Sequence, residues 1–456
     1  MKTPIVDFVR RYQESGMVRF HMPGHKGAGF LGCEGFDITE IAGADELYDA
    51  RGIIAESERN AASLFGAGRT FYSTEGSSQC IRAMLRLAML RQTGGTPLIL
   101  AARNVHKAFV YGAALLGLEV RWLWPEETDS LCSCRISPAQ LENALAALPS
   151  PLAAAYVTSP DYLGGMADVQ GLAEVCHRHN TLLLVDNAHG AYLHFLEKPL
   201  HPLDLGADLC CDSAHKTLPV LTGGAYLHLS RRVSDELCGE SRQALALFGS
   251  TSPSYLTLCS LDRCNAYLAG AFRQNLAEWT ALLGKTRQAL RQNGWQVEES
   301  DPLRLTLRAP AGQTGTGLAR LLRAAGMECE YADGEHLVLM LTPQNRPEEL
   351  GRLVEALGRN DRPPKPPENL PLPKARQEMS IREAMLRPQE RVPAEKSLGR
   401  VCGSPTVACP PAIPITVRRA HRPGGCDAAS PLRRGKRGGR ERVKTRGIPL
   451  AKPAPL

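Results

Sequence analysis

The stretch CCDSAHKTLP at Cys210–Pro219 decides the fold, together with the stretch LLLVDNAH at Leu182–His189 that precedes it. Each is a short apolar run that leads into polar, reactive side chains. Apolar runs of this length are typical of buried parallel strands. In open α/β sheets, ligands bind beyond the carboxyl ends of such strands. The two stretches therefore predict a site to which one strand brings Asp186 and a later one brings Lys216.

A carboxylate and an amine delivered to one edge of a sheet suit a particular cofactor. Pyridoxal phosphate needs a Lys for its Schiff base and an acidic partner for its pyridinium nitrogen. Taken singly, Lys216 fits a surface loop and Asp186 fits the cap of a helix. The joint arrangement favours the cofactor.

Composition is ordinary for a globular protein and indicates several domains. The chain has 456 residues, of which 43% are hydrophobic and 22% charged, and a length of this kind suggests two or three domains of roughly 150 residues each. No apolar stretch resembles a secretory signal or a membrane span, which predicts a cytoplasmic protein without a membrane partner. The 14 Cys follow no framework pattern. We expect reduced thiols and no metal site.

The net charge of +7 comes from the C-terminal tail. From Arg418 to Leu456 there are twelve Lys and Arg against two acidic residues, so the tail carries +10 and the remaining residues carry −3. The tail is poor in apolar residues, which predicts disorder. A basic tail can bind nucleic acid without sequence preference, but this one has no aromatic residue to stack on bases. Nucleic-acid binding is therefore only a remote alternative function, and no specific nucleic-acid partner is expected.

Between residues 56 and 265, candidate strands alternate with helical stretches. This alternation predicts an α/β domain whose mostly parallel sheet is sandwiched by helices. A single helical stretch from about Leu256 to Gln292 leads into a smaller α+β domain. The expected units are an N-terminal arm and substrate-entrance segment (1–55), a large cofactor-binding domain (56–265), a small domain (266–360), a linker and truncated C-terminal segment (361–417) and the tail (418–456).

Three further motifs are candidates for cofactor contacts. Gly76, Ser77 and Ser78 precede a helix, whose N-terminus attracts anions, although an ordinary helix cap has the same pattern. A second hydroxyl cluster, which includes Thr251 and Ser252, has the same two interpretations. His106 follows a strand and can stack on an aromatic ring, although a lone His is more often structural.

The motifs coincide, in order and in spacing, with those of a known family over roughly residues 5–415. The chain resembles the ornithine/lysine/arginine decarboxylases of the aspartate-aminotransferase-like fold (pyridoxal-phosphate fold type I), in a short form without the N-terminal wing domain. The matching segments are His21–Gly27, Asp37–Glu40, Gly43–Asp45, Phe65–Ser78, Arg103–Lys107, Thr158–Tyr162, Asp186–Gly190, Ser213–Thr222 and Thr251–Tyr255.

The resemblance implies a role for each candidate residue. Lys216 carries the Schiff base, Asp186 binds the pyridine nitrogen, and His106 stacks on the ring. The remaining cofactor contacts fall on Gly76, Ser77, Ser78, Ser213 and His215 around the phosphate, on His189, and on Thr251 and Ser252. The Thr251–Tyr255 segment would reach the site of a neighbouring subunit, which makes a homodimer or a higher homo-oligomer the active unit. Residues 21–45 would shape the substrate entrance, where their acids could meet a distal cation.

The activity that the resemblance implies is pyridoxal-phosphate-dependent decarboxylation of arginine, lysine or ornithine to the amine, as in polyamine biosynthesis. Transamination or a lyase reaction with the same cofactor is the alternative. The sequence departs from the family at Asn187, where many members have Glu, and at Tyr192, where many have His. The match also stops after Ile415, which we interpret as a shifted reading frame or a truncated gene.

Overall fold

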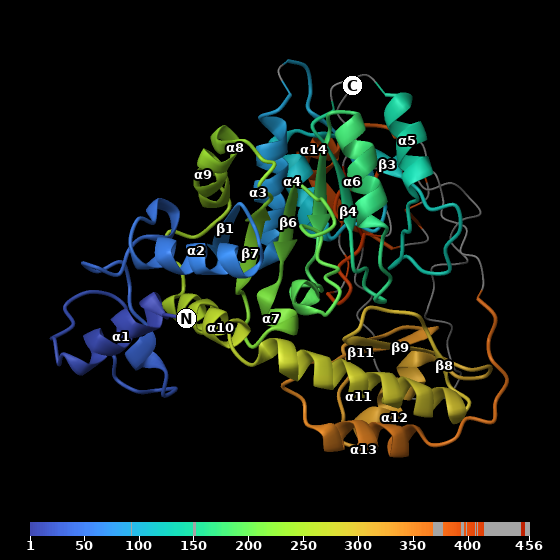
Figure 1. The fold of residues 1–456 in the computed structure, drawn as a ribbon. Helices are drawn as coiled ribbons and strands as arrows, with labels where there is room; N and C mark the ends of the chain where they lie inside the picture. Colours follow the sequence, from blue (N-terminus) through green and yellow to red (C-terminus); the bar gives the residue numbers. More distant parts are fainter. Residues whose placement is uncertain are drawn as a thin grey trace.

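The computed structural model describes residues 1–414, except for 93, 149–151, 368–376, 394–395, 398, 406 and 408, together with residues 448–451. The described helices and strands fall into a large sheet domain, a small sheet domain and an N-terminal arm (Figure 1). No helix of the described part is long and apolar enough to cross a membrane.

The large domain is built on a seven-stranded sheet of order β1-β7-β6-β5-β4-β2-β3. Strands β2 to β6 are parallel to one another, and only β7 runs against its two neighbours. The predicted fold class, a mostly parallel sheet with a smaller α+β domain, is confirmed. The strands are β1 (Arg69–Ser73), β2 (Leu98–Ala102), β3 (Glu119–Leu123), β4 (Ala154–Thr158), β5 (Leu182–Asp186), β6 (Leu209–Asp212) and β7 (Ala225–Leu229).

Helices cover both faces of this sheet because its central strands are apolar on both sides. In β5, Leu182 and Leu184 pack into one core cluster, whereas Leu183 and Val185 pack into another on the opposite face. The first face is covered by helices that include α3 (Ser77–Met89), α4 (Lys107–Leu116), α8 (Asp235–Gly239), α9 (Ser241–Ala246) and α14 (Ile381–Leu386), the second by α5 (Pro138–Ala146) and α6 (Val169–Arg178).

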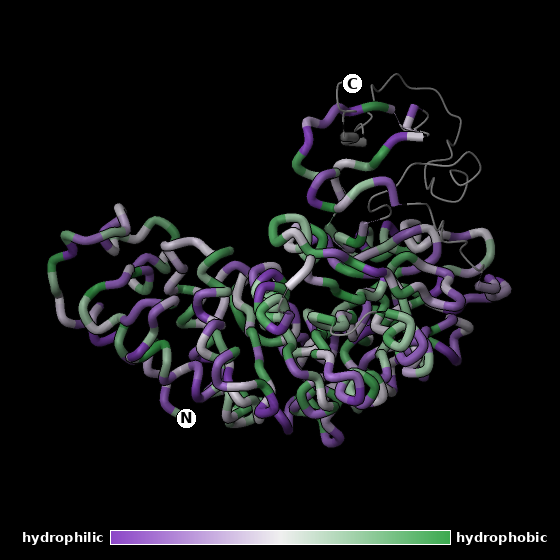
Figure 2. The backbone as a smooth tube through the Cα atoms, turned by 90° about the horizontal axis from the view of Figure 1, so that it is seen from above, coloured by the Kyte–Doolittle hydropathy of each residue, from purple (hydrophilic) through white to green (hydrophobic). Residues whose placement is uncertain are grey.

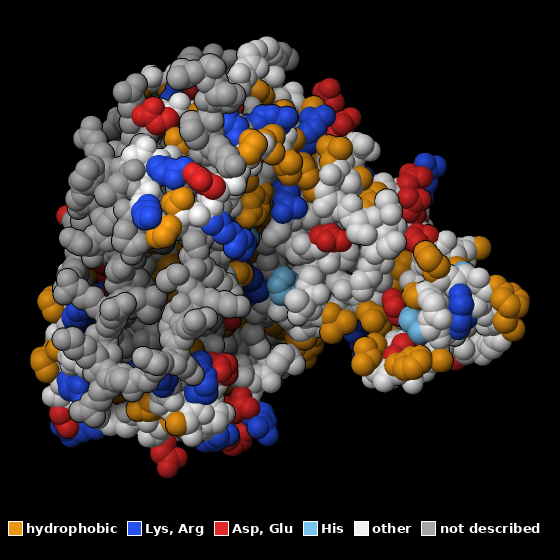
Figure 3. All heavy atoms as spheres, turned by 180° about the vertical axis from the view of Figure 1, so that it is seen from behind, with side chains coloured by type: hydrophobic (Ala, Val, Ile, Leu, Met, Phe, Trp, Pro, Cys, Tyr) orange, Lys and Arg blue, Asp and Glu red, His pale blue; other side chains and the backbone are white. Residues whose placement is uncertain are grey.

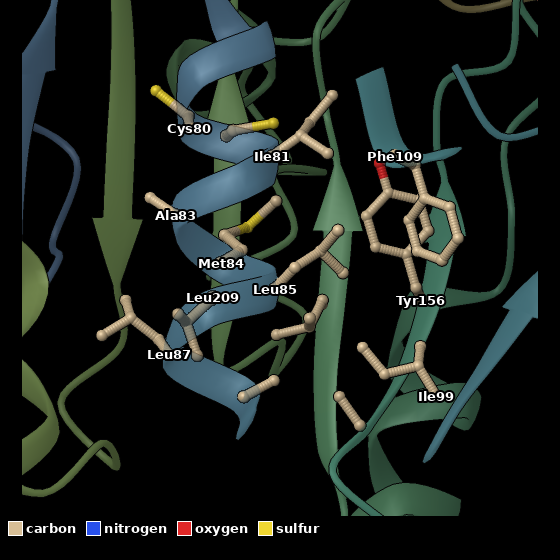
Figure 4. Close-up of a cluster of buried hydrophobic side chains, with 14 of the residues drawn as sticks. Cys80, Ile81, Ala83, Met84, Leu85, Leu87, Ile99, Phe109, Tyr156 and Leu209 are labelled. Carbon is tan, nitrogen blue, oxygen red and sulfur yellow. The ribbon is translucent and has the colours of Figure 1, made fainter. Parts of the chain in front are cut away.

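The core beneath α3 shows how the helix is fixed on the sheet (Figure 4). Apolar side chains at helical spacing, among them Ile81, Met84 and Leu85, point from α3 toward the strands. The rings of Phe109 of α4 and Tyr156 of β4 are in contact, with centroids 4.5 Å apart and planes tilted by 51°. Burial of this face holds the N-terminus of α3 at the carboxyl edge of the sheet. Hydrophobic segments run through the interior of the whole body (Figure 2).

The small domain has a four-stranded antiparallel sheet of order β10-β11-β9-β8. Its core lies between this sheet and three helices. The elements are β8 (Gln296–Val297), β9 (Arg304–Arg308), β10 (Tyr331–Ala332), β11 (His336–Met340), α11 (Phe272–Gln292), α12 (Gly315–Ala324) and α13 (Pro347–Leu357). The domain boundaries stay a prediction, although the two sheets lie on opposite sides of residue 265.

The single helix expected from about Leu256 to Gln292 was wrong, because the structure contains two. α10 (Tyr255–Leu268) ends before Gly270, and α11 begins at Phe272. Glycine is unfavourable inside a helix, and the two helices pack into different surroundings. α10 packs on α1 (Pro4–Glu14) and α2 (Ile53–Leu64), whereas α11 contacts α13 and β8 of the small domain.

Part of the C-terminal region also differs from expectation. Ile448–Ala451 form β13, which pairs antiparallel with β12 (Gln389–Val392), so the prediction of a disordered tail fails for these four residues. A strand needs backbone partners rather than a large apolar surface, and a free strand edge supplies them. Residues 418–447, which carry most of the basic charge, lie outside the described residues.

The N-terminal arm forms a lobe that projects from the body (Figure 3). Its 3-10 turns are η1 (Glu34–Phe36) and η2 (Leu47–Asp49), and a third turn of the chain, η3 (Leu193–Phe195), lies in the large domain. Large apolar side chains of the arm are exposed to an unusual degree, including Phe20 at 94%, Phe30 at 85% and Leu31 at 88%. Exposed apolar groups that gather in one place are typical of interaction surfaces.

Candidate active site

Asp186 and Lys216 meet at the carboxyl edge of the sheet, as the sequence predicted. Asp186 is the last residue of β5, and Lys216 lies in α7 (Ala214–Thr217), the short helix that follows β6. β5 and β6 are hydrogen-bonded neighbours, so their two ends lie side by side. In Figure 1, α7 lies at the edge of the large sheet that faces the small domain.

The Asp186 carboxyl group is buried and has weak protein partners. It is 2% exposed and accepts from Tyr156 Oη at 3.2 Å and from the Ala188 N–H at 3.2 Å. Burial raises the pKa of Asp186, and the nearby positive charge of Lys216 opposes that rise. A buried carboxylate of this kind is stabilised by a cation in direct contact.

Lys216 is paired with an imidazole. Its Nζ lies 2.9 Å from Nε2 of His189, a residue that is 5% exposed. Burial lowers the pKa of Lys216, an effect opposed by the charge of Asp186. Burial, followed by the Lys216 charge, lowers the pKa of His189 well below its usual range. His189 is therefore neutral and accepts the hydrogen bond, while Lys216 is shifted toward the nucleophilic neutral amine.

His106 caps α4 and is held as a neutral ring. Its Nδ1 accepts from the Ala108 N–H at 3.1 Å. Burial, with a further contribution from the Lys216 charge, lowers the pKa of His106 to about 3. The structure therefore places His106 within the electrostatic reach of Lys216, and a neutral ring can stack on an aromatic cofactor without a charge penalty.

The hydroxyl cluster at the start of α3 has the features of a phosphate cradle. Ser213 Oγ, from the end of β6, donates to Ser77 Oγ at 2.8 Å, at the first residue of α3. Gly76 has a φ of 70°, and the space where a side chain would lie holds no other atom within 4 Å. Ser78 is half-buried in the first turn of the same helix. Backbone N–H groups and hydroxyls at a helix N-terminus suit an anion.

Two groups of predicted residues make their hydrogen bonds away from Lys216. His215 precedes Lys216, but its Nδ1 lies 2.9 Å from the Gly224 carbonyl oxygen. Thr251 and Ser252 are exposed, and among the described residues no hydrogen bond joins them to Asp186, His189 or Lys216. Exposed hydroxyls ahead of α10 remain available to a second subunit, which is the role that the sequence predicts for them.

Sequence reasoning missed two acids beside the site. Glu330 of the small domain accepts from Tyr162 Oη at 2.5 Å, and the Tyr162 ring meets His189 edge-on with centroids 5.2 Å apart. Asp212, quoted only as part of a strand, is fully buried behind Asp186. In the sequence, only its position at the end of a predicted strand indicates that Asp212 lies near the site. No local sequence pattern indicates this for Glu330.

The C-terminal segment returns to border the site. The Ala412 carbonyl accepts from the Lys107 N–H at 2.8 Å, and the Pro414 carbonyl accepts from Arg103 Nη2 at 2.6 Å. Ile413 packs with Tyr162 in a small apolar cluster. Residues of both domains and of the C-terminal segment thus surround the entrance beside His189.

The residues fit pyridoxal phosphate. Asp186 is a buried acid that needs a cationic partner such as a protonated ring nitrogen, and Lys216 lies beside it. Ser77, Ser213 and the open backbone at Gly76 lie where a phosphate is held. No metal is needed for this donor set.

Comparisons with known proteins agree with this geometry. The profile described as "Orn/Lys/Arg decarboxylase, major domain" matches residues 3–309. An arginine decarboxylase of Halalkalibacterium halodurans is 30% identical over 458 residues, covering 91% of this chain and 90% of the relative. An arginine decarboxylase of Bacillus subtilis is 29% identical, with coverage of 91% and 90%. The constitutive lysine decarboxylase of Escherichia coli superposes with a TM-score of 0.75 at 16% identity, covering 93% of this chain and 76% of that one.

The neutral state of His106 predicts a pH dependence of stability. The pKa of His106 falls from 6.5 to about 3 on folding. Between these two pH values the ring is protonated in the unfolded chain and neutral in the folded chain. The contribution of His106 to the free energy of unfolding is therefore fully present above about pH 6.5, and it is lost as the pH falls toward 3. We expect His106→Phe to flatten the loss of unfolding free energy between pH 6.5 and 5, measured from urea midpoints. An unchanged slope contradicts a buried neutral His106.

Proposed function

The chain belongs to the Orn/Lys/Arg decarboxylase family, and we propose that it removes the α-carboxyl group of a basic amino acid with the help of pyridoxal phosphate. The observation that carries this proposal is the meeting of Lys216, Asp186 and His189 at one edge of the sheet, with an acid of the small domain close by. Arginine, lysine and ornithine are the candidate substrates.

Each residue at the site has a task in this proposal. Pyridoxal phosphate, when bound, supplies an electron sink for the carbanion that loss of carbon dioxide leaves at Cα. Lys216 would hold the cofactor covalently through Nζ. Asp186 would hold the ring nitrogen in its protonated form, and His106 would lie against the ring. Ser77, Ser78 and Ser213 would hold the phosphate.

His189 governs the proton at Lys216. Its Nε2 accepts from Lys216 Nζ at 2.9 Å, and its own low pKa keeps it from charging. The proton therefore stays on Nζ, at the point where a substrate carbon would need it after carbon dioxide has left. General acid catalysis of this kind requires a donor within hydrogen-bond reach.

The direct test is the product. Purified protein supplied with pyridoxal phosphate and each basic amino acid should release carbon dioxide and a diamine or agmatine. Lys216→Ala should neither fix the cofactor covalently on borohydride reduction nor form product. A keto acid in place of the amine would favour transamination, and a reducible cofactor bond in Lys216→Ala would contradict the assignment of the lysine.

Glu330 is proposed to receive the distal cation of the substrate. It is half-buried, and the contacts from Lys216 through His189 and Tyr162 end on its carboxylate. Hydrogen bonds to charged groups contribute about 1.5 to 3 kcal/mol. We expect Glu330→Gln to raise the KM for the preferred basic amino acid by about ten- to a hundredfold with little change in kcat.

The control for that experiment is Glu328→Gln. Glu328 lies two residues away, is exposed, and pairs with Arg323 at 2.7 Å on the surface. Its loss should leave KM unchanged. Equal KM values for wild type and Glu330→Gln would exclude this carboxylate from substrate recognition.

The oligomeric state and the cellular location are also proposals. The exposed apolar side chains of the arm and the exposed hydroxyls of Thr251 and Ser252 support a dimer in which each subunit borders the site of the other. The cytoplasmic location also stays a prediction.

A further inference from the structure

A buried polar network lies directly behind Asp186. Asn187 Nδ2 donates to Asp212 Oδ1 at 2.7 Å, and Asp212 Oδ2 lies 3.0 Å from His201 Nε2 and 3.3 Å from His228 Nε2. All four residues are 0% exposed. We call Asn187, Asp212, His201 and His228 the Asp212 network.

The network joins the two strand ends that carry the chemistry. Asn187 follows Asp186 at the end of β5, and Asp212 ends β6 just ahead of Ser213. The Asn187 N–H also donates to the Cys211 carbonyl at 3.0 Å. A shift of Asp212 would therefore move both the acid at one end of the cofactor and the hydroxyl at the other.

The hydrogen atoms of the network can be assigned from its outer contacts. His201 Nδ1 accepts from the Leu203 N–H at 3.3 Å, so its proton is on Nε2, which faces Asp212. His228 Nδ1 lies 2.8 Å from Thr70 Oγ1, and burial lowers the pKa of His228. His201 Nε2–H thus donates to Asp212 Oδ2, and His228 Nε2 lies 3.3 Å from the same oxygen. Burial alone raises the pKa of Asp212, yet its His partners hold it well below the usual range.

Hydrogen bonding accounts for these residues better than a metal ion. His201, Cys210 and Asp212 lie close enough together to hold one. However, Asp212 Oδ2 already lies at hydrogen-bond distance from His201. Burial also raises the pKa of the Cys210 thiol well above its usual value, and metals bind the thiolate.

Residues 187 and 212 are matched in charge. Asn187 presents an amide, and not a carboxylate, to Asp212. A carboxylate there would face the Asp212 carboxylate in a dry interior, where like charges repel strongly. The amide instead supplies the donor that Asp212 Oδ1 accepts.

We propose that Asp212, acting through Asn187, is a positioning residue that fixes Asp186 against the ring nitrogen of the cofactor. The inference rests on the proposed function only for the identity of that cofactor. Asp212 itself is buried and touches neither substrate nor Lys216 among the described contacts, so its effect is transmitted through the network.

The test exchanges the two side chains. Asn187→Asp places two carboxylates in contact, and Asp212→Asn leaves the His201 donor and the Asn187 donor with one oxygen instead of two. The double variant Asn187→Asp/Asp212→Asn restores a carboxylate–amide hydrogen bond and still turns an oxygen toward His201 and His228. We expect each single variant to weaken pyridoxal phosphate binding about tenfold or more and the double variant to recover most of that loss.

Two readouts separate positioning from a general loss of structure. The first is the dissociation constant of pyridoxal phosphate, from fluorescence titration of the apoprotein. The second is the pH midpoint of the bound cofactor's absorbance change, which should shift in the single variants and return in the double variant. If one of the single variants fails to fold, Asn187→Ala takes its place. This milder change adds no charge and should shift the same pH midpoint.

The matched control is Asp204→Asn. Asp204 pairs with His194 at 2.8 Å, an Asp–His contact outside the Asp212 network. It should change neither readout. Unchanged midpoints in all three single variants of the network, or a double variant as impaired as the sum of its parts, would overturn the proposal. Because neither readout needs substrate, a protein that binds cofactor but forms no amine would refute the proposed reaction and leave this test intact.

Discussion

A carboxylate buried at the end of β5 is the constraint on which the rest of the structure depends. Burial of Asp186 is unfavourable for its charge unless cations and donors surround it. The fold meets this need by placing Lys216 just beyond the end of the adjacent strand and Tyr156 on the neighbouring strand on the other side. The same low-exposure setting depresses the pKa of Lys216 and keeps His106 and His189 neutral. Burial at the carboxyl edge of the sheet thus shifts the pKa values of Asp186, Lys216, His106 and His189 together.

Both domains contribute residues to the site. The large domain supplies Asp186, His189 and Lys216 at or just beyond strand ends, where the parallel sheet fixes their positions. The small domain supplies Glu330, and it is joined to the large domain by buried contacts such as that of Arg304 Nη1 with the Tyr162 carbonyl at 2.6 Å. Tyr192 donates to Asp301 at 2.5 Å and so strengthens the same junction. On the proposed function, substrate selectivity depends on how the domains are held together.

Much of this was accessible from sequence because parallel strands are short, apolar and followed at once by their functional residues. That pattern gave Asp186, Lys216 and the sheet itself, whereas Ser213 came from the resemblance to the family. Tertiary contacts decided the remainder. Glu330 reaches the site only through the placement of the small domain. The break near Gly270 separates a helix that packs on α1 and α2 from one that reaches α13 and β8. The pairing of β13 with β12 was equally beyond local pattern, since a strand edge far along the chain provides its partners.

The central claim is that Asp186 serves as the charged partner of a cofactor ring nitrogen, and turnover of Asp186→Asn measured together with cofactor occupancy tests it most directly. The substitution preserves shape but removes the charge, while the contacts of Ser77 and Ser213 with the phosphate remain. The account predicts that turnover falls far more than occupancy. Near-normal turnover in Asp186→Asn would contradict it.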